Sequence, residues 1–89
     1  MDIRMKNQET AKEFREKLVG KRFKHFKGNI YKVIEVGIHS EDAGCMVIYH
    51  SDNDETLVWV RPLEMFLSDV DKLKYPDVKQ KLRFEELTI

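Results

Sequence analysis

Histidines and one neighbouring acid are the side chains of this sequence best suited to hold a metal or to move a proton. His39 and Glu41 stand two residues apart, and His25 and His50 are the other imidazoles. Imidazole with carboxylate binds zinc or non-haem metals and also performs acid–base chemistry. The spacing matches no established ligand signature, so we predict no metal and no cofactor. A site built on His25, His39 and Glu41 stays open as an alternative.

The only cysteine offers a nucleophile, and its chemistry would need a neighbouring base. Cys45 could pair with His39 or His50 as a thiol–imidazole couple. Strand alternation places Cys45 on the face opposite both histidines, and free cysteines in strands are usually buried. The sequence has no phosphate-cradling glycine loop and no dinucleotide fingerprint. We therefore predict no catalytic residue, and a binding module in preference to an enzyme.

Trp59 and Arg61 form a candidate for anion or peptide recognition. They are two residues apart, so on a strand they share one face. An indole ring and a guanidinium group together can hold a carboxylate, a phosphate or a peptide. The alternative is that Trp59 covers the core and that Arg61 pairs with Glu35 or Glu64.

A basic stretch with interleaved aromatic rings is the candidate for nucleic-acid binding. Its cations are Lys21, Arg22, Lys24, Lys27 and Lys32. Residues 1–34 hold ten Lys/Arg against four Asp/Glu, and residues 35–89 hold six against twelve, so that the formal net charge is zero. Small barrels bind single strands through such charges and rings. The alternative is that the basic and acidic halves of the chain attract each other, within the fold or across a dimer. Basic residues on an edge strand also oppose aggregation.

Length and composition indicate one soluble domain covering residues 1–89. Of the 89 residues, 42% are hydrophobic and 36% are charged. No apolar run approaches the roughly 20 residues that span a bilayer, and the N-terminus lacks the apolar core of a signal peptide. A lone cysteine excludes an internal disulfide and fits a reducing compartment. We expect a cytoplasmic monomer or homodimer with no membrane segment.

Hydrophobic spacing predicts one helix followed by strands. Ala11, Phe14 and Leu18 recur at helical spacing between a capping-box threonine and Gly20, which predicts a helix within residues 9–20 after a loose segment 1–8. Strands are predicted at 22–26, 30–39, 45–50, 56–61 and 82–87, with a helical turn at 63–70 and a polar excursion at 71–81. Five short strands predict a mainly β fold, a small SH3-like barrel over residues 22–87. The alternative is an open antiparallel sheet with the helix on one face.

Strand register decides which side chains share a face. Four-residue hairpin loops at 41–44 and 52–55 would pair Ser40 with Cys45 and Ser51 with Thr56. The expected core face then holds Ile30, Ile34, Val36, Ile38, Cys45, Val47, Tyr49, Val58 and Val60. The opposite face, the candidate site, holds Tyr31, Val33, Glu35, His39, Met46, Ile48, His50, Leu57, Trp59 and Arg61.

Several motifs resemble a known bacterial family, the domain-of-unknown-function family number 1653. They are FKHFKGNIY at 23–31, HSE at 39–41, VIY at 47–49, WVRPLEMF at 59–66 and RF at 83–84. The resemblance covers about residues 22–87 and implies an SH3-like barrel with no settled activity. It singles out His25, His39, Glu41, Trp59 and Arg61. The segment 71–81 is longer than the family's short hairpin and the N-terminal helix is an extension, so the closure of the last strand stays open.

We therefore expect this domain to bind a small anion or a peptide. The ligand-binding candidates are His25, Tyr31, His39, Glu41, His50, Trp59 and Arg61. Nucleic-acid binding by the basic half, and a metal or acid–base site at His25, His39 and Glu41, are the alternatives.

Overall fold

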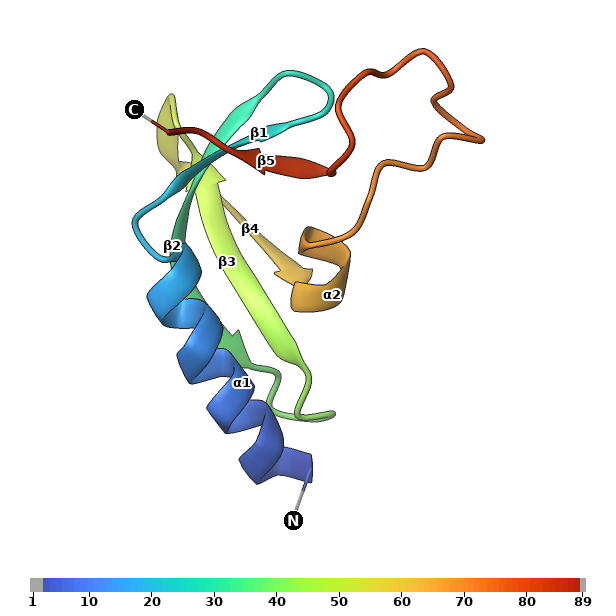
Figure 1. Cartoon of the computed structure of the whole chain (residues 1–89). Coiled ribbons are helices and arrows are strands. Elements are labelled where there is room, and N and C mark those ends of the chain that lie inside the picture. The colour runs from blue at the N-terminus through green and yellow to red at the C-terminus, as the bar shows by residue number, and fades with distance from the viewer. Residues whose placement is uncertain (1–2, 89) are drawn as a thin grey trace.

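The computed structural model describes residues 3–88, with side chains described from residue 6 onward, and contains two helices and five strands (Figure 1). The elements are α1 (Ile3–Leu18), β1 (Arg22–His25), β2 (Ile30–Ile38), β3 (Cys45–Ser51), β4 (Asp54–Pro62), α2 (Leu63–Phe66) and β5 (Phe84–Glu86). All five predicted strands are present, each near its expected position. The predicted helical turn ends at Phe66, before Val70.

The five strands form one antiparallel sheet in the order β4-β3-β2-β1-β5. Within the described residues no strand pairing joins β4 to β5, so these two are edges and the sheet is open. The mainly β fold with an N-terminal helix is confirmed. The open-sheet alternative fits this arrangement, and closure into a barrel is not confirmed. None of the helices in the described part of the chain has the length and hydrophobicity needed to cross a membrane.

Helix α1 is longer than predicted because it begins at Ile3. The loose segment predicted for residues 1–8 is wrong for residues 3–8, and its first two residues lie outside the described chain. No glycine or proline interrupts this stretch, and the side-chain amide of Asn7 donates to the carbonyl of Ala43 over 2.5 Å. Thr10 does not cap the helix: its hydroxyl donates to the carbonyl of Lys6 over 3.1 Å, in mid-helix.

One face of the sheet carries the core, where α1 and α2 pack against the strands. Ala11 and Leu18 of α1 are buried there, as their helical spacing predicts. Phe66 of α2 is 1% exposed and stacks on Phe84 with 4.2 Å between ring centroids. The buried cluster comprises Ala11, Leu18, Phe23, Val33, Val36, Val47, Tyr49, Leu63, Phe66 and Phe84. These side chains connect both helices to the sheet.

The β2–β3 register differs from the prediction at both the loop and the strand. Ile38 pairs with Cys45, so the connecting loop has six residues, 39–44, and not four. A bulge then follows between Val33 and Glu35, where the Glu35 carboxylate accepts the Val36 amide N–H over 2.8 Å. An extra residue reverses alternation, so Val33 and Val36 both point into the core at 0% exposure. Ile34, predicted in the core, is 39% exposed.

The β3–β4 register is shifted by one residue, which exchanges the two faces of β4. Tyr49 pairs with Trp59 and His50 with Val58. The cause is a two-residue turn that pairs Ser51 with Asp54, followed by an irregularity in β4. Val58 and Val60, predicted in the core, point away from it and are 51% and 59% exposed. His50 therefore lies on the face opposite Trp59, against the prediction.

Residues 67–83 leave the sheet and return, standing off from its end (Figure 1). The base of this excursion is closed by an Asp69–Leu82 bridge and by the Val70 amide donating to the Lys81 carbonyl over 2.8 Å. The side chain of Gln80 donates to the Lys24 carbonyl over 2.9 Å. These bonds hold the excursion beside β1.

Candidate anion-binding site

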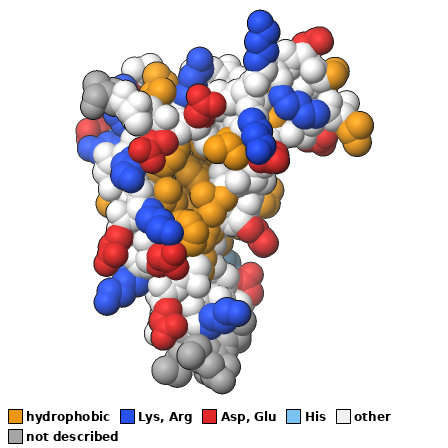
Figure 2. All heavy atoms as spheres, in the orientation of Figure 1, with side chains coloured by type: hydrophobic (Ala, Val, Ile, Leu, Met, Phe, Trp, Pro, Cys, Tyr) orange, Lys and Arg blue, Asp and Glu red, His pale blue; other side chains and the backbone are white. Residues whose placement is uncertain are grey.

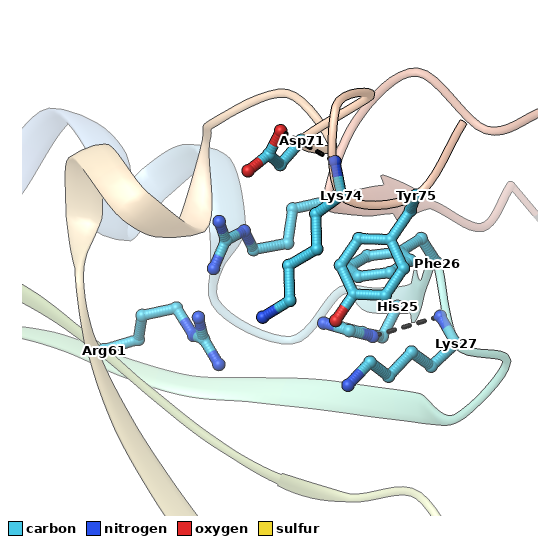
Figure 3. Close-up of a pocket in the computed structure, with 8 residues that line it drawn as sticks. His25, Phe26, Lys27, Arg61, Asp71, Lys74 and Tyr75 are labelled. Atoms are coloured by element: carbon cyan, nitrogen blue, oxygen red, sulfur yellow. Dashed lines mark hydrogen bonds between the residues drawn. The ribbon is translucent and has the colours of Figure 1, made fainter. Parts of the chain in front are cut away.

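The turn after β1, the end of β4 and the excursion enclose a pocket of about 260 Å³. We call it the cationic pocket. Its lining residues are His25, Phe26, Lys27, Arg61, Asp71, Lys74, Tyr75 and Arg83. Figure 3 shows the side chains of Lys27, Arg61 and Lys74 converging on the same space.

Four positive charges line this pocket: Lys27, Arg61, Lys74 and Arg83. No carboxylate of the described side chains lies within 4.0 Å of any of their nitrogens. The one acid in the lining, Asp71, accepts the backbone N–H groups of Leu73 and Lys74 over 3.1 and 3.3 Å. Nε of Arg83 is buried and has no hydrogen-bond partner in the described structure. Four cations against the single carboxylate of Asp71 give the lining a net positive charge, which makes the cavity attractive to an anion.

Arg61 is fixed by the aromatic cluster behind it. Its Nε donates to the hydroxyl of the buried Tyr49 over 3.2 Å, and its guanidinium carbon lies 5.6 Å from the ring centroid of Phe84. A guanidinium held in this way keeps its remaining N–H groups in a fixed fork that suits a carboxylate or a phosphate.

A wall of aromatic rings supports the lysines of the pocket. Tyr75, from the excursion, packs on Phe26 with ring centroids 4.9 Å apart, and Phe26 packs on His25 at 4.4 Å (Figure 3). The ammonium groups of Lys27 and Lys74 lie 5.6 and 5.5 Å from the Tyr75 centroid. Tyr75 thus joins the excursion to the sheet and positions cations around one space.

His25 is an imidazole of the pocket lining whose positive charge is suppressed. Burial, followed by the charges of Arg61, Lys27 and Arg83, lowers the pKa of His25 from 6.5 to about 4. Its Nδ1 accepts the Lys27 backbone N–H over 3.1 Å, so in the neutral ring the proton sits on Nε2. At neutral pH His25 is an uncharged hydrogen-bond donor among cations.

We expect an NMR titration of the His25 ring to give a pKa near 4, raised when sulfate is added. The bound dianion favours the imidazolium form, and sulfate does not itself titrate in this range. Because the folded pKa lies below the unfolded value of 6.5, the unfolded chain takes up protons first. Stability should therefore fall as the pH drops from about 6.5 towards 4. His25→Gln should flatten that slope, and a folded-state pKa near 6.5 would contradict the structure.

A second hollow of about 210 Å³ adjoins the first and shares His25, Lys27 and Arg61 with it. We call it the aromatic hollow. It is otherwise lined by Asn29, Tyr31, Tyr49, Trp59 and Phe84. Four of the seven predicted ligand-binding residues, His25, Tyr31, Trp59 and Arg61, thus meet around one opening.

The other three predicted residues lie elsewhere. Nδ1 of His39 accepts the Glu41 backbone N–H over 3.1 Å, within the 39–44 loop. Nδ1 of His50 lies 2.8 Å from the Ser51 carbonyl, on the face of the sheet away from Trp59. In the described part of the chain, no three His, Cys, Asp or Glu side chains are grouped as a metal site would require.

The predicted basic stretch is dispersed by the fold. Arg22 forms a two-pronged ion pair with Asp52 at 3.0 and 2.6 Å, which raises the pKa of Arg22 and lowers that of Asp52. Lys21 lies 3.7 Å from Glu86. Lys24 and Lys32 are exposed outside both hollows, and Lys27 alone of the five lines them.

Cys45 is held away from the pocket. Its Sγ donates to the carbonyl of Asn7 over 3.3 Å, and burial raises the pKa of the thiol. It therefore stays protonated and poorly nucleophilic.

Phe26, Asp71, Lys74, Tyr75 and Arg83 are the site residues that the sequence prediction missed. Asp71, Lys74 and Tyr75 fall within the segment 71–81, which its sequence predicted only as a polar excursion. The available signal was Tyr75, a lone aromatic ring followed by proline within a charged segment.

A larger apolar hollow of about 380 Å³ lies between α1 and β5, and Figure 2 shows hydrophobic side chains gathered on this face with charged groups around them. Its charged lining residues are already paired: Lys21 with Glu86 at 3.7 Å, and Lys17 with Glu13 at 2.8 Å. It offers no uncompensated charge comparable with the cationic pocket.

Comparison with known proteins gives a family for most of this chain. A family model described as "Protein of unknown function (DUF1653)" matches residues 21–86, which include β1 to β5 and both hollows. No curated protein and no solved structure gives a significant match. The match spans well over half of the chain, and the chain therefore belongs to the DUF1653 family.

Proposed function

We propose that this domain is a binding module for a small anion, held in the cationic pocket by Lys27, Arg61, Lys74 and Arg83. The observation that carries the proposal is four cations around one cavity with no carboxylate paired to them among the described residues. The buried, unpartnered Nε of Arg83 supports it, because an unmet buried donor costs about 1–3 kcal/mol.

The chemistry of the lining suits a carboxylate or a phosphate. Arg61 presents a fixed fork, the lysines present point charges, and neutral His25 adds a donor without further charge. An anion between like charges also relieves their mutual repulsion. A peptide carboxylate carries the same chemistry as a free organic acid, so a peptide end is a ligand of the same class. A lone protonated cysteine fits action in the cytoplasm.

Calorimetry with inorganic phosphate at constant ionic strength tests this proposal. Removing one charged contact costs about 1.5–3 kcal/mol, hence roughly tenfold or more in Kd. Arg83→Gln and Lys74→Gln should each weaken phosphate binding by about tenfold or more. Lys79→Gln is the matched control, because Lys79 belongs to the same excursion and does not line the pocket.

Two results would reject the anion module. One is the absence of phosphate binding to the unaltered protein. The other is a loss of phosphate affinity in Lys79→Gln equal to that in Arg83→Gln and Lys74→Gln, which would indicate general attraction between the anion and a basic surface. Binding of a random oligonucleotide with steep salt dependence spread over Lys21, Arg22, Lys24, Lys27 and Lys32 would instead favour the nucleic-acid alternative.

A further inference from the structure

The two adjoining hollows differ in chemistry while sharing an edge. The cationic pocket carries four positive charges, whereas the non-shared lining of the aromatic hollow is rings and one amide. His25, Lys27 and Arg61 stand between them. A ligand that fills both therefore needs an anionic group next to an apolar, polarisable part.

Trp59 is the ring in the aromatic hollow that is open to a ligand. Tyr49 and Phe84 are 3% and 4% exposed and belong to the core, whereas Trp59 is 49% exposed. Tyr31 meets Tyr49 edge to face at 5.2 Å, but none of the ring pairs among the described residues includes Trp59. An exposed indole without an aromatic partner, beside fixed cations, is a stacking surface.

The rim of the aromatic hollow also carries hydrogen-bonding groups. The side-chain amide of Asn29 lies 3.5 Å from the Tyr31 hydroxyl, and both belong to the lining. An amide and a phenol can donate to or accept from the polar edge of a heterocycle. Inorganic phosphate alone, held in the cationic pocket, would use neither these groups nor the indole.

We propose that the ligand is a flat heterocycle joined to a phosphate, of the class of a nucleoside 5′-monophosphate. Its phosphate lies in the cationic pocket and its base stacks on Trp59. This inference rests on the proposed anion site and adds the second half of the ligand. The same chemistry occurs in a free nucleotide and at the 5′-phosphorylated end of a single strand.

Calorimetry with inorganic phosphate, adenosine 5′-monophosphate and a 5′-phosphorylated trinucleotide tests the inference. Because one base stacks on the indole, the mononucleotide should bind about tenfold more tightly than phosphate. Trp59→Ala should remove that advantage and leave phosphate binding unchanged, and Trp59→Phe should restore part of it. Leu57→Ala is the matched control, because Leu57 is also 49% exposed on β4 and does not line either hollow.

The outcomes separate this inference from the anion module. Equal affinity for phosphate and mononucleotide would overturn the stacking half and leave the anion module standing. Equal loss of both ligands in Trp59→Ala would also overturn it, because the indole would then support the cations and not a base. Failure of phosphate and mononucleotide to bind would remove both proposals. Tighter binding of the trinucleotide than of the mononucleotide would identify the end of a single strand as the ligand. Tighter binding of the mononucleotide would identify a free nucleotide.

Discussion

Phe66→Ala is expected to lower the free energy of unfolding by about 3–5 kcal/mol. Phe66 is 1% exposed, and its ring stacks on Phe84 and meets Phe23 edge to face with centroids 5.2 Å apart. These partners lie on β5 and β1, so the ring of Phe66 connects α2 to both strands. Alanine at this position would leave a cavity between α2, β1 and β5, and these elements cannot move together to fill it.

Chemical denaturation followed by far-UV circular dichroism measures this effect. Met65→Ala serves as the control, because Met65 is its neighbour in α2 and is 44% exposed. We expect Met65→Ala to cost less than about 1 kcal/mol. Equal losses in the two variants would mean that α2 does not pack on the sheet as the structure shows.

The Phe66 anchor also matters for binding. Arg61 is followed by Pro62 and then α2, and its guanidinium lies on the ring of Phe84, the stacking partner of Phe66. Loosening Phe66 therefore releases both the backbone and the ring that orient Arg61. Phe66→Leu, which keeps most of the apolar volume, should preserve folding and raise the phosphate Kd modestly.

Much of the fold follows from local sequence patterns. The spacing of Ala11, Phe14 and Leu18 correctly predicts the buried side of α1, and the five strands are recognisable from β-branched and aromatic runs. The strand register could not be predicted in this way. It depends on loop lengths and bulges, which the alternation of apolar residues does not reveal. The bulge before Glu35 is held by the Glu35 carboxylate, which accepts the Val36 amide N–H. The same carboxylate accepts a hydrogen bond from Nε of Arg15, on α1, over 2.6 Å. That contact is tertiary, so alternation of apolar residues could not predict the bulge by which Val33 is buried in place of Ile34.

The candidate site was predictable only where local spacing along one strand relates its residues. Trp59 and Arg61 share a face at any register, so their partnership followed from spacing alone. Their relation to His50 depended on the β3–β4 turn and was wrong. Tyr75 and Lys74 reach the pocket through a long connection, and no periodic pattern encodes where such a connection returns.

Replacing residues 71–80 by an Asn-Gly turn is expected to abolish most phosphate binding while keeping the fold. Val70 and Lys81 are already joined by a 2.8 Å hydrogen bond next to the Asp69–Leu82 bridge. A two-residue turn can therefore close the same base. The change removes Lys74 and Asp71 from the lining and Tyr75 from the wall behind Phe26 and Lys27. Loss of the direct Lys74 contact with the anion and of the Tyr75 support predicts a rise in Kd of at least about tenfold.

Thermal unfolding and phosphate calorimetry on the same shortened chain distinguish the two roles of the excursion. The core does not include residues 71–80, so the unfolding temperature should change far less than in Phe66→Ala. Leu73→Ser is the matched control within the excursion, since Leu73 is 97% exposed and should affect neither measurement. Unchanged phosphate affinity in the shortened chain would place the anion outside the cationic pocket. Unfolding of the shortened chain would mean that the excursion stabilises the sheet, because the Gln80 side chain donates a hydrogen bond to the Lys24 carbonyl on β1. The expected combination, an intact sheet with lost affinity, would identify the excursion as the part of this chain that completes the binding site.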